Sequence, residues 1–329
     1  MSDWKSSFTS VLAHYIIAFI EEKRKIGYKY ITEFRHLRNL DQFLVERNLR
    51  KIELPQNLVE TWVKRKKTQT HRTQQIRIIC IRNFAKYLLA QGKYAYYPEI
   101  YATEKSTSSF KPYIFSHEEI QSLFTMADAM SQELVRGCYA SYFHVVIRLL
   151  YTTGCRAGEI AALRWRDIDL ANGVLKIYDA KYRKDRFVPL APGMTAYLKR
   201  YAERQIEYSP DTYVFRGWWQ NNPSASSFYL CFRKLLFRCG ISHSGRGKGP
   251  RLHDLRHTFA VHNLERWLKA KMNPMEKLPI LADYLGHQSI SSTQYYLRLI
   301  PSIHEELVVR MENAIGSKIT VRGEFNETD

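Results

Sequence analysis

The sequence predicts a mainly α protein with a small β-hairpin, that is, an α+β chain divided into two domains. Apolar residues recur at helical spacing along most of the chain, and two short segments read as strands. A Ser- and Thr-rich stretch near residue 105 interrupts both patterns. A length of 329 residues fits roughly two domains of about 150 residues each. Hydrophobic residues make up 45% of the chain, which argues against a disordered protein.

The first third is predicted to be a small helical domain, residues 1–103. Apolar spacing marks three helices, over 12–23, around 34–44, and over 70–91, where Gly92 ends the last one. A shorter helix contains Leu58 and Trp62 and leads into a basic run, KRKK. We expect a linker over 104–112, because this stretch loses the apolar periodicity and gains Ser and Thr.

The second domain is predicted to span residues 113–318, with a tail over 319–329. Its elements are expected as a helix opened by the capping box Ser116-His117-Glu118-Glu119, an apolar helix over 138–151, and strands over 174–178 and 186–190. The tip between the two strands is short and basic, AKYRK. Helical patterns fill the rest of the chain.

The charge of the chain points to a polyanion. There are 50 Lys and Arg residues against 32 Asp and Glu, a formal net charge of +18. Residues 1–110 hold 20 of the basic and 10 of the acidic residues, so this third carries +10. Such an excess disfavours an ordinary metabolic enzyme and suits nucleic acid or an acidic membrane surface. No stretch of about 20 apolar residues is present, which argues against a membrane span.

The cysteine pattern bears on compartment and cofactors. Five cysteines without a CxxC pair argue against a disulfide framework or a structural zinc site and favour a reducing compartment, the cytoplasm. His253 and His257 have the i, i+4 spacing of zinc ligands. However, Asp254 replaces the Glu of HExxH, and no third ligand is evident. There is also no GxxxxGKS or GxxxxGKT loop of the kind that binds nucleotide phosphates.

Four segments place polar residues at turns and helix starts. They read TGCRAGEIAALRW, AKYRKDRFVPL, HDLRHTFA and YLGHQSISSTQYY, in that order. In these residues and their order the chain resembles the tyrosine recombinase, or phage integrase, family over most of residues 113–315. The resemblance implies a catalytic domain of this family preceded by a helical core-binding domain, the two closing on DNA as a clamp. The segment LPILADYLGH is more similar to recombinases of transposons and other mobile elements than to Xer-type enzymes.

The resemblance implies six catalytic residues: Arg156, Lys181, His253, Arg256, His287 and Tyr296. Guanidinium groups suit the non-bridging oxygens of a phosphodiester, because they are planar donor forks that stay protonated. A lysine at a hairpin tip can protonate the leaving 5′-oxygen, and imidazole titrates near neutrality. The tyrosine attacks phosphorus and forms a phosphotyrosyl enzyme, so the family needs neither ATP nor a metal, and the resemblance implies no cofactor and no metal for this chain. Glu159 either supports an active-site side chain by a hydrogen bond or is a solvated helix residue.

Several of these residues have neighbours that compete with them. Tyr295 directly precedes Tyr296, but the family places an apolar or aromatic residue before its nucleophile, which favours Tyr296. Arg183 and Lys184 compete with Lys181 for the hairpin role. His257 is expected to be a structural hydrogen-bonding residue rather than a metal ligand.

By family analogy the first domain lays its helices against the major groove. The candidate contacts are basic residues, most of them to phosphates: Lys64, Arg65, Lys66, Lys67, Arg72 and Arg77. The chain begins almost directly with this domain, so no arm-binding domain is expected before it. Apolar residues recur over 303–315, and this helix either folds onto its own core or docks on a neighbour in a homotetramer on two DNA sites. Accessory recombination proteins are further candidate partners.

Three functions compete at this point. The leading hypothesis is a site-specific recombinase that integrates or excises a mobile element through a 3′-phosphotyrosyl intermediate. A type IB topoisomerase-like nicking–closing enzyme uses a similar constellation without pairing two sites. A non-catalytic helical DNA-binding regulator explains the charge and the first domain, but it does not explain four ordered motifs.

Overall fold

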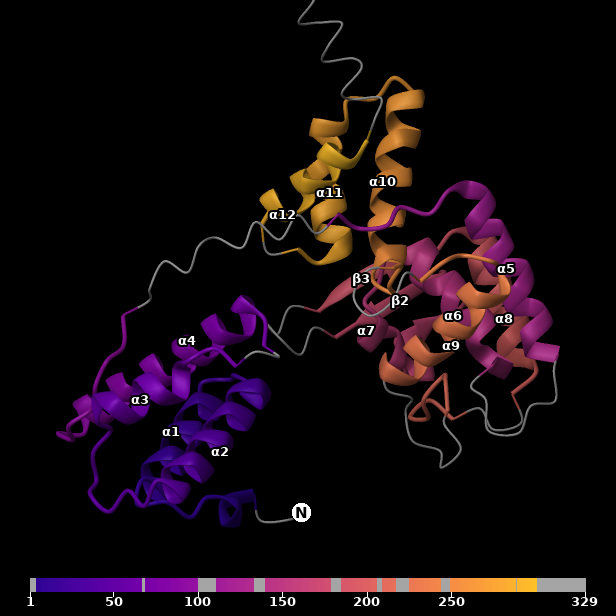
Figure 1. Cartoon of the computed structure of the whole chain (residues 1–329). Coiled ribbons are helices and arrows are strands. Elements are labelled where there is room, and N and C mark those ends of the chain that lie inside the picture. The colour runs from indigo at the N-terminus through magenta and orange to yellow at the C-terminus, as the bar shows by residue number, and fades with distance from the viewer. Residues whose placement is uncertain are drawn as a thin grey trace, which may run out of the picture. The chain divides into compact units, whose positions relative to one another are not determined.

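The computed structural model describes residues 4–66, 69–99, 111–132, 140–178, 185–205, 209–216, 225–243, 249–287 and 289–300. The chain divides into two compact units, Met1–Phe110 and Lys111–Asp329 (Figure 1). The division falls inside the predicted linker, of which residues 104–110 lie outside the described residues. Within the described residues, no helix combines the length and the apolar character that a membrane span requires.

The first unit is helical, as predicted. Its α-helices are α1 (Ala13–Lys25), α2 (Ile31–Glu46), α3 (Gln56–Val63) and α4 (His71–Ala90). Helix α4 begins where Thr70 accepts a hydrogen bond from the Thr73 backbone N–H at 3.2 Å, an N-cap contact. The apolar faces of the four helices meet in one core that includes Ile16, Leu37 and Phe84, all buried.

The second unit contains a larger core formed by several helices. These are α5 (His117–Gln132), α6 (Ala140–Thr153), the short α7 (Ala157–Ala161), α8 (Pro192–Glu203) and α9 (Ala225–Arg238). The predicted capping box at the start of α5 is present. The Glu119 N–H donates to Ser116 Oγ at 3.1 Å, and the Ser116 N–H donates to Glu119 Oε2 at 2.9 Å.

A small antiparallel sheet lies in this unit, with strand order β1-β2-β3. The strands are β1 (Ile168–Asp169), β2 (Val174–Ile177) and β3 (Arg186–Pro189). Leu175 pairs with Val188, and both side chains are buried, which fixes the register of β2 and β3. The sequence predicted β2 and β3 but missed β1, because two residues are too short for an alternation pattern.

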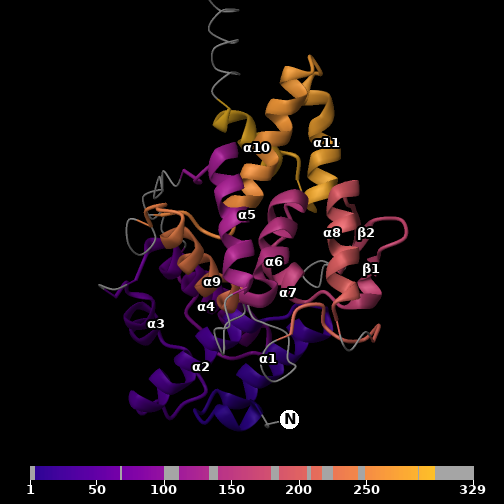
Figure 2. The same ribbon diagram turned by 90° about the vertical axis from the view of Figure 1, so that its right-hand side faces the viewer.

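Helices α10 (Asp254–Lys269) and α11 (Pro274–Leu285) form the last part of the described chain, followed by α12 (Ser291–Gln294) and a 3-10 helix, Tyr295–Leu299. Helix α10 contacts both α6 and α11, and it lies beside α11 in both views (Figures 1 and 2). A third core joins α10, α11 and the 3-10 helix, and it includes Leu264, Leu281 and Tyr296. This packing brings the third and fourth sequence motifs together.

Candidate active site

Two glycine turns set the positions of the two arginines predicted to be catalytic. Gly154 follows α6 and Gly286 caps α11, and both adopt left-handed backbone, with φ of 60° and 67°. A Cβ at Gly154 would lie 2.6 Å from Phe259 Cδ1 and 2.8 Å from Leu285 Cδ2, so the position also needs glycine for space. The carbonyl oxygens of these two turns accept hydrogen bonds from the arginines.

Arg256 lies in the first turn of α10 and is 2% exposed. Its Nη1 donates to the Gly154 carbonyl and its Nη2 to the Leu285 carbonyl, each at 2.7 Å. Among the described residues, Arg256 forms no ion pair with a carboxylate. A buried charge without a counter-ion is costly, so this environment favours an anionic ligand.

Glu159 holds the Arg156 side chain. This contact supports the first of the two readings of Glu159, a residue that supports an active-site side chain by a hydrogen bond. Arg156 is the N-cap of α7, and its Nη1 donates to Glu159 Oε1 at 2.7 Å while its backbone N–H donates to Oε2 at 2.8 Å. Its Nη2 donates to the Gly286 carbonyl at 3.3 Å. The Arg156 side chain remains 41% exposed, so it reaches the surface of the site.

The sequence did not reveal Arg186, the first residue of β3. Its Nη2 donates to Glu159 Oε2 at 2.8 Å and its Nη1 to Oε1 at 3.1 Å, and only 11% of the side chain is exposed. Burial alone would raise the pKa of Glu159, but Arg186 and Arg156 bring it down to about 2. Arg186 lies on the same face of β3 as the buried Val188. An arginine at an inward-facing strand position was therefore the one sequence feature that could have identified it as a site residue.

His253 and His287 approach the arginines from two elements. His253 is the N-cap of α10, and His287 follows the Gly286 turn, where its Nδ1 lies 2.8 Å from Thr293 Oγ1. Burial, Arg256 and Arg156 lower the pKa of each histidine to about 4, and His253 is at the same time exposed to solvent. The direction of both shifts favours the neutral ring near pH 7.

Tyr296 is buried in this cluster, with 2% of its surface exposed. Its hydroxyl lies 3.3 Å from His257 Nδ1, and its ring stacks on His287 with centroids 6.1 Å apart. Burial raises the pKa of the Tyr296 phenol, and the positive charges of Arg256 and Arg156 oppose that rise. Its neighbour Tyr295 is 37% exposed. The structure therefore gathers five of the six predicted catalytic residues, and the sixth, Lys181, lies outside the described residues.

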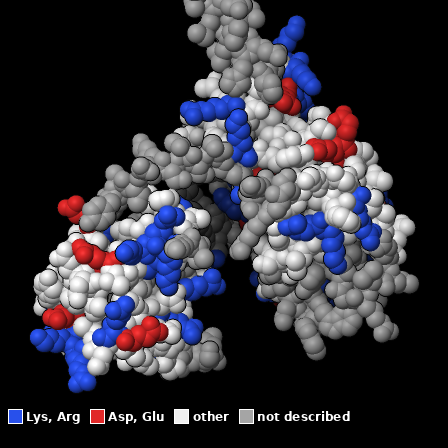
Figure 3. All heavy atoms as spheres, viewed as in Figure 1, with Lys and Arg blue, Asp and Glu red and all other residues white. Residues whose placement is uncertain are grey.

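The predicted DNA-contacting residues divide into two groups. Lys64, Arg65, Lys66 and Arg72 are exposed on the first unit, where Figure 3 shows many Lys and Arg side chains, and Lys67 lies outside the described residues. The prediction for Arg77 is corrected, because only 5% of this residue is exposed. Its guanidinium lies 4.3 Å from the centre of the Trp62 ring and donates to Gln69 Oε1 at 2.9 Å, so it stabilises the core of the unit.

Comparison with known proteins agrees with this geometry. The sequence model of the phage integrase family matches residues 114–302, more than half of the chain. The putative integrase/recombinase y4rB of Sinorhizobium fredii is 29% identical over 299 residues, 89% of this chain and 95% of that protein. The tyrosine recombinase XerA of Pyrococcus furiosus is 32% identical over 179 residues, 53% of this chain and 57% of that protein.

Among solved structures, the Tn1549 transposon integrase in complex with a circular intermediate DNA has a similar fold. Its TM-score is 0.60 at 15% identity, and the match covers 90% of this chain and 99% of that one. The fold is thus that of the tyrosine recombinase class. The family match over more than half of the chain completes the identification: the chain belongs to the phage integrase family.

Proposed function

We propose that the protein is a site-specific DNA recombinase that cleaves and rejoins DNA through a 3′-phosphotyrosyl intermediate. One observation carries the proposal. The buried Arg256 donates to two backbone carbonyls but has no carboxylate partner among the described residues, and the equally buried Tyr296 lies close enough for the charge of Arg256 to act on its phenol. A cation of this kind suits the non-bridging oxygen of a phosphodiester.

The two arginines would bind and polarise the scissile phosphate. Arg256 is fixed by the turns around Gly154 and Leu285, and Arg156 by Glu159, so neither guanidinium has to reorganise when charge develops on phosphorus. Arg186 acts as a positioning residue, since it donates to both oxygens of the Glu159 carboxylate that holds Arg156. His253 and His287 would donate further hydrogen bonds to the phosphate oxygens.

In the proposed chemical step, the Tyr296 oxygen attacks phosphorus, the Tyr–O–P bond forms and the bond from phosphorus to the 5′-oxygen breaks. The phenolic proton passes to a base, and His257, whose Nδ1 lies 3.3 Å from the Tyr296 hydroxyl, is placed to accept it. The 5′-oxygen takes a proton from a general acid, the role we propose for Lys181. Rejoining reverses these transfers, with a 5′-hydroxyl attacking the phosphotyrosine.

We propose that the first unit binds duplex DNA and that the two units form a clamp on it. The exposed Lys64, Arg65, Lys66 and Arg72 would contact phosphates, together with Lys67. Contacts of this type set position and salt dependence, and they carry no direct sequence information.

The assembly and the biological setting are further parts of the proposal. A homotetramer on two DNA sites would pair the sites, with residues 303–315, outside the described residues, docking on a neighbouring subunit. The similarity to a transposon integrase supports integration and excision of a mobile element as the setting. The DNA substrate and the free cysteines are consistent with action in the cytoplasm.

The test is covalent trapping of DNA. A target is first selected from a random-sequence duplex pool by binding to Tyr296→Phe, and a nicked version of it then serves as suicide substrate. We expect a covalent DNA adduct with the wild type and with Tyr295→Phe, the matched control, and none with Tyr296→Phe. An adduct with Tyr296→Phe would overturn the assignment of the nucleophile. Relaxation of plasmids without exchange between two sites would identify a nicking–closing enzyme, and binding without any adduct would identify a regulator.

A further inference from the structure

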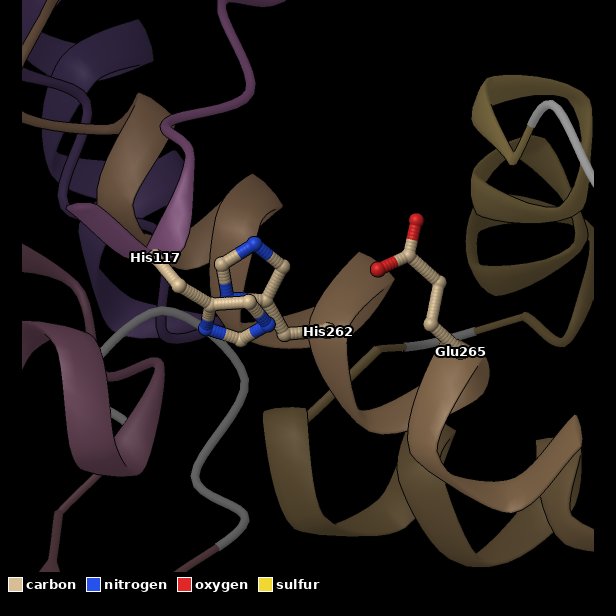
Figure 4. A group of neighbouring side chains, drawn as sticks. All are labelled: His117, His262 and Glu265. Atoms are coloured by element: carbon tan, nitrogen blue, oxygen red, sulfur yellow. The ribbon is translucent and has the colours of Figure 1, made fainter. Parts of the chain in front are cut away.

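A second group of chemically active side chains lies on α10, away from the arginines. His262 and Glu265 project from successive turns of α10, and His117 is the first residue of α5 (Figure 4). One potential ligand atom from each of the three lies within 4.8 Å of the other two. In the described part of the chain, no other three His, Cys, Asp or Glu side chains meet this condition.

Local contacts bring these three residues together. The spacing of three between His262 and Glu265 places both on one face of α10. The Phe115 N–H donates to Thr258 Oγ1 at 3.1 Å, which fixes the chain just before α5 against α10. The His117 and His262 rings consequently lie with centroids 4.1 Å apart and planes inclined by 32°.

We propose that His117, His262 and Glu265 bind one divalent transition-metal ion of the zinc class. Two imidazoles and one carboxylate are donors that Zn²⁺ accepts, whereas Mg²⁺ and Ca²⁺ prefer all-oxygen sites. Ligand distances of about 2.0–2.2 Å place tetrahedral ligand atoms roughly 3.4 Å apart. Rotations of the exposed His117 and of the long Glu265 side chain close the present separation. Figure 4 shows the Glu265 carboxylate directed toward the two rings.

The surroundings of His262 fit a metal ligand. Its Nδ1 lies 2.9 Å from Tyr151 Oη, so an ion on Nε2 leaves an Nδ1–H that donates to the tyrosine oxygen. Glu265 forms no hydrogen bond or ion pair with any other residue in the described chain.

A cavity gives access to the proposed ion site. All three side chains line a cavity of about 650 Å³, which leaves room for water as the fourth ligand. Arg266 and Lys269 line the same cavity and oppose the ion by charge, although Arg266 Nη2 is engaged by Asn263 Oδ1 at 2.7 Å. The site is therefore weaker than a closed structural zinc site.

The ion would act as a brace within the second unit. It would join the first turn of α5 to the middle of α10. The N-terminal end of α10 carries His253 and Arg256. His262 follows Arg256 by six residues, roughly 9 Å along the helix axis. The ion thus lies away from the phosphate site and takes no part in strand cleavage, so its failure would leave the proposed recombinase function untouched.

The experiment titrates Zn²⁺ into chelator-treated full-length protein, in competition with a chromophoric chelator. We expect one equivalent to bind, raising the melting temperature, and His117→Ala and Glu265→Gln each to weaken the affinity by about tenfold or more. His253→Ala is the control, because it alters the other group of histidines and should leave this equivalent unchanged. Co²⁺ in place of Zn²⁺ should give the intense visible absorption of a tetrahedral site in the wild type and in His253→Ala, and not in His117→Ala or Glu265→Gln.

Unfolding of the metal-free variants checks that the substitutions alone do not disturb the fold, since His117 is exposed and Glu265 only half-buried. Equal Zn²⁺ affinity in the wild type, His117→Ala and Glu265→Gln would overturn the proposal. If His253→Ala lost the bound Zn²⁺ while His117→Ala and Glu265→Gln kept it, the ion would belong to the arginine site. That result would also overturn the proposal.

Discussion

Among the described residues, each unit buries one arginine, and the two are held in different ways. Arg77 in the first unit lies against the Trp62 ring and donates to the Gln69 side chain, so an aromatic face and an amide stabilise its charge. Arg256 in the second unit donates to two backbone carbonyls, forms no ion pair with a carboxylate among the described residues, and has Arg156 and Tyr296 nearby. Burial of a guanidinium therefore does not by itself mark a site. The nature of its partners separates a structural arginine from one prepared for an anion.

The largest expected effect separates these two arginines directly. Arg256→Ala should reduce the rate of adduct formation by about 10³-fold or more, because a positioned arginine stabilises transition-state charge on phosphorus by that order. Arg77→Ala should lower the free energy of unfolding by about 1–3 kcal/mol and leave the single-turnover rate at saturating DNA close to that of the wild type. Rates measured on the suicide substrate and urea unfolding supply the two readouts. Similar losses of rate in both variants would remove the distinction.

A medium effect concerns Glu159, which the two neighbouring arginines keep ionised. Because its pKa is depressed from 4.5 to about 2, its charge contributes stability that is present above its ordinary pKa and is lost as the pH falls toward 2. Glu159→Gln should therefore be less stable than the wild type near pH 7, and the difference should shrink as the pH falls below about 4.5. Urea unfolding over a pH series measures this. A difference that does not depend on pH would show that charge is not the source.

The smallest expected effect concerns the surface of the first unit. Arg72→Ala should decrease the slope of log binding constant against log salt concentration by about 1, since each phosphate contact releases roughly one counterion. Arg77→Ala should leave that slope unchanged, because its side chain is buried. Binding measured at several salt concentrations gives both slopes. A reduced slope for Arg77→Ala would contradict the correction made for this residue.

The parts of the site that local sequence determines were predictable, and those that depend on tertiary contacts were not. The motif around Arg156 and the motif around Arg256 each combine a turn with a helix start, and those signals lie within a few residues. Arg186 was missed because its contact with Glu159 depends on how β3 packs against α7, which no local pattern encodes. Arg77 was misjudged for the same reason, because its burial depends on Trp62 approaching from α3.

The mainly α class and the core helices followed from apolar periodicity, which reports burial directly. The strand β1 was too short to give any such signal. The group formed by His117, His262 and Glu265 could not be predicted from the sequence either. His117 belongs to α5 and the other two residues to α10, and these helices are far apart in the chain. A search for zinc ligands by spacing alone found His253 and His257 instead.

The carbonyls of Gly154 and Leu285 that hold Arg256 have a consequence for how activity arises during folding. These two groups belong to the ends of α6 and α11, while the arginine belongs to α10, so the guanidinium is aimed only when three helices have docked. A chain in which α11 has detached would retain its charge and its affinity for polyanions. It would lack a correctly positioned Arg256 guanidinium. The ability to cleave DNA strands would therefore appear only when the tertiary structure is complete.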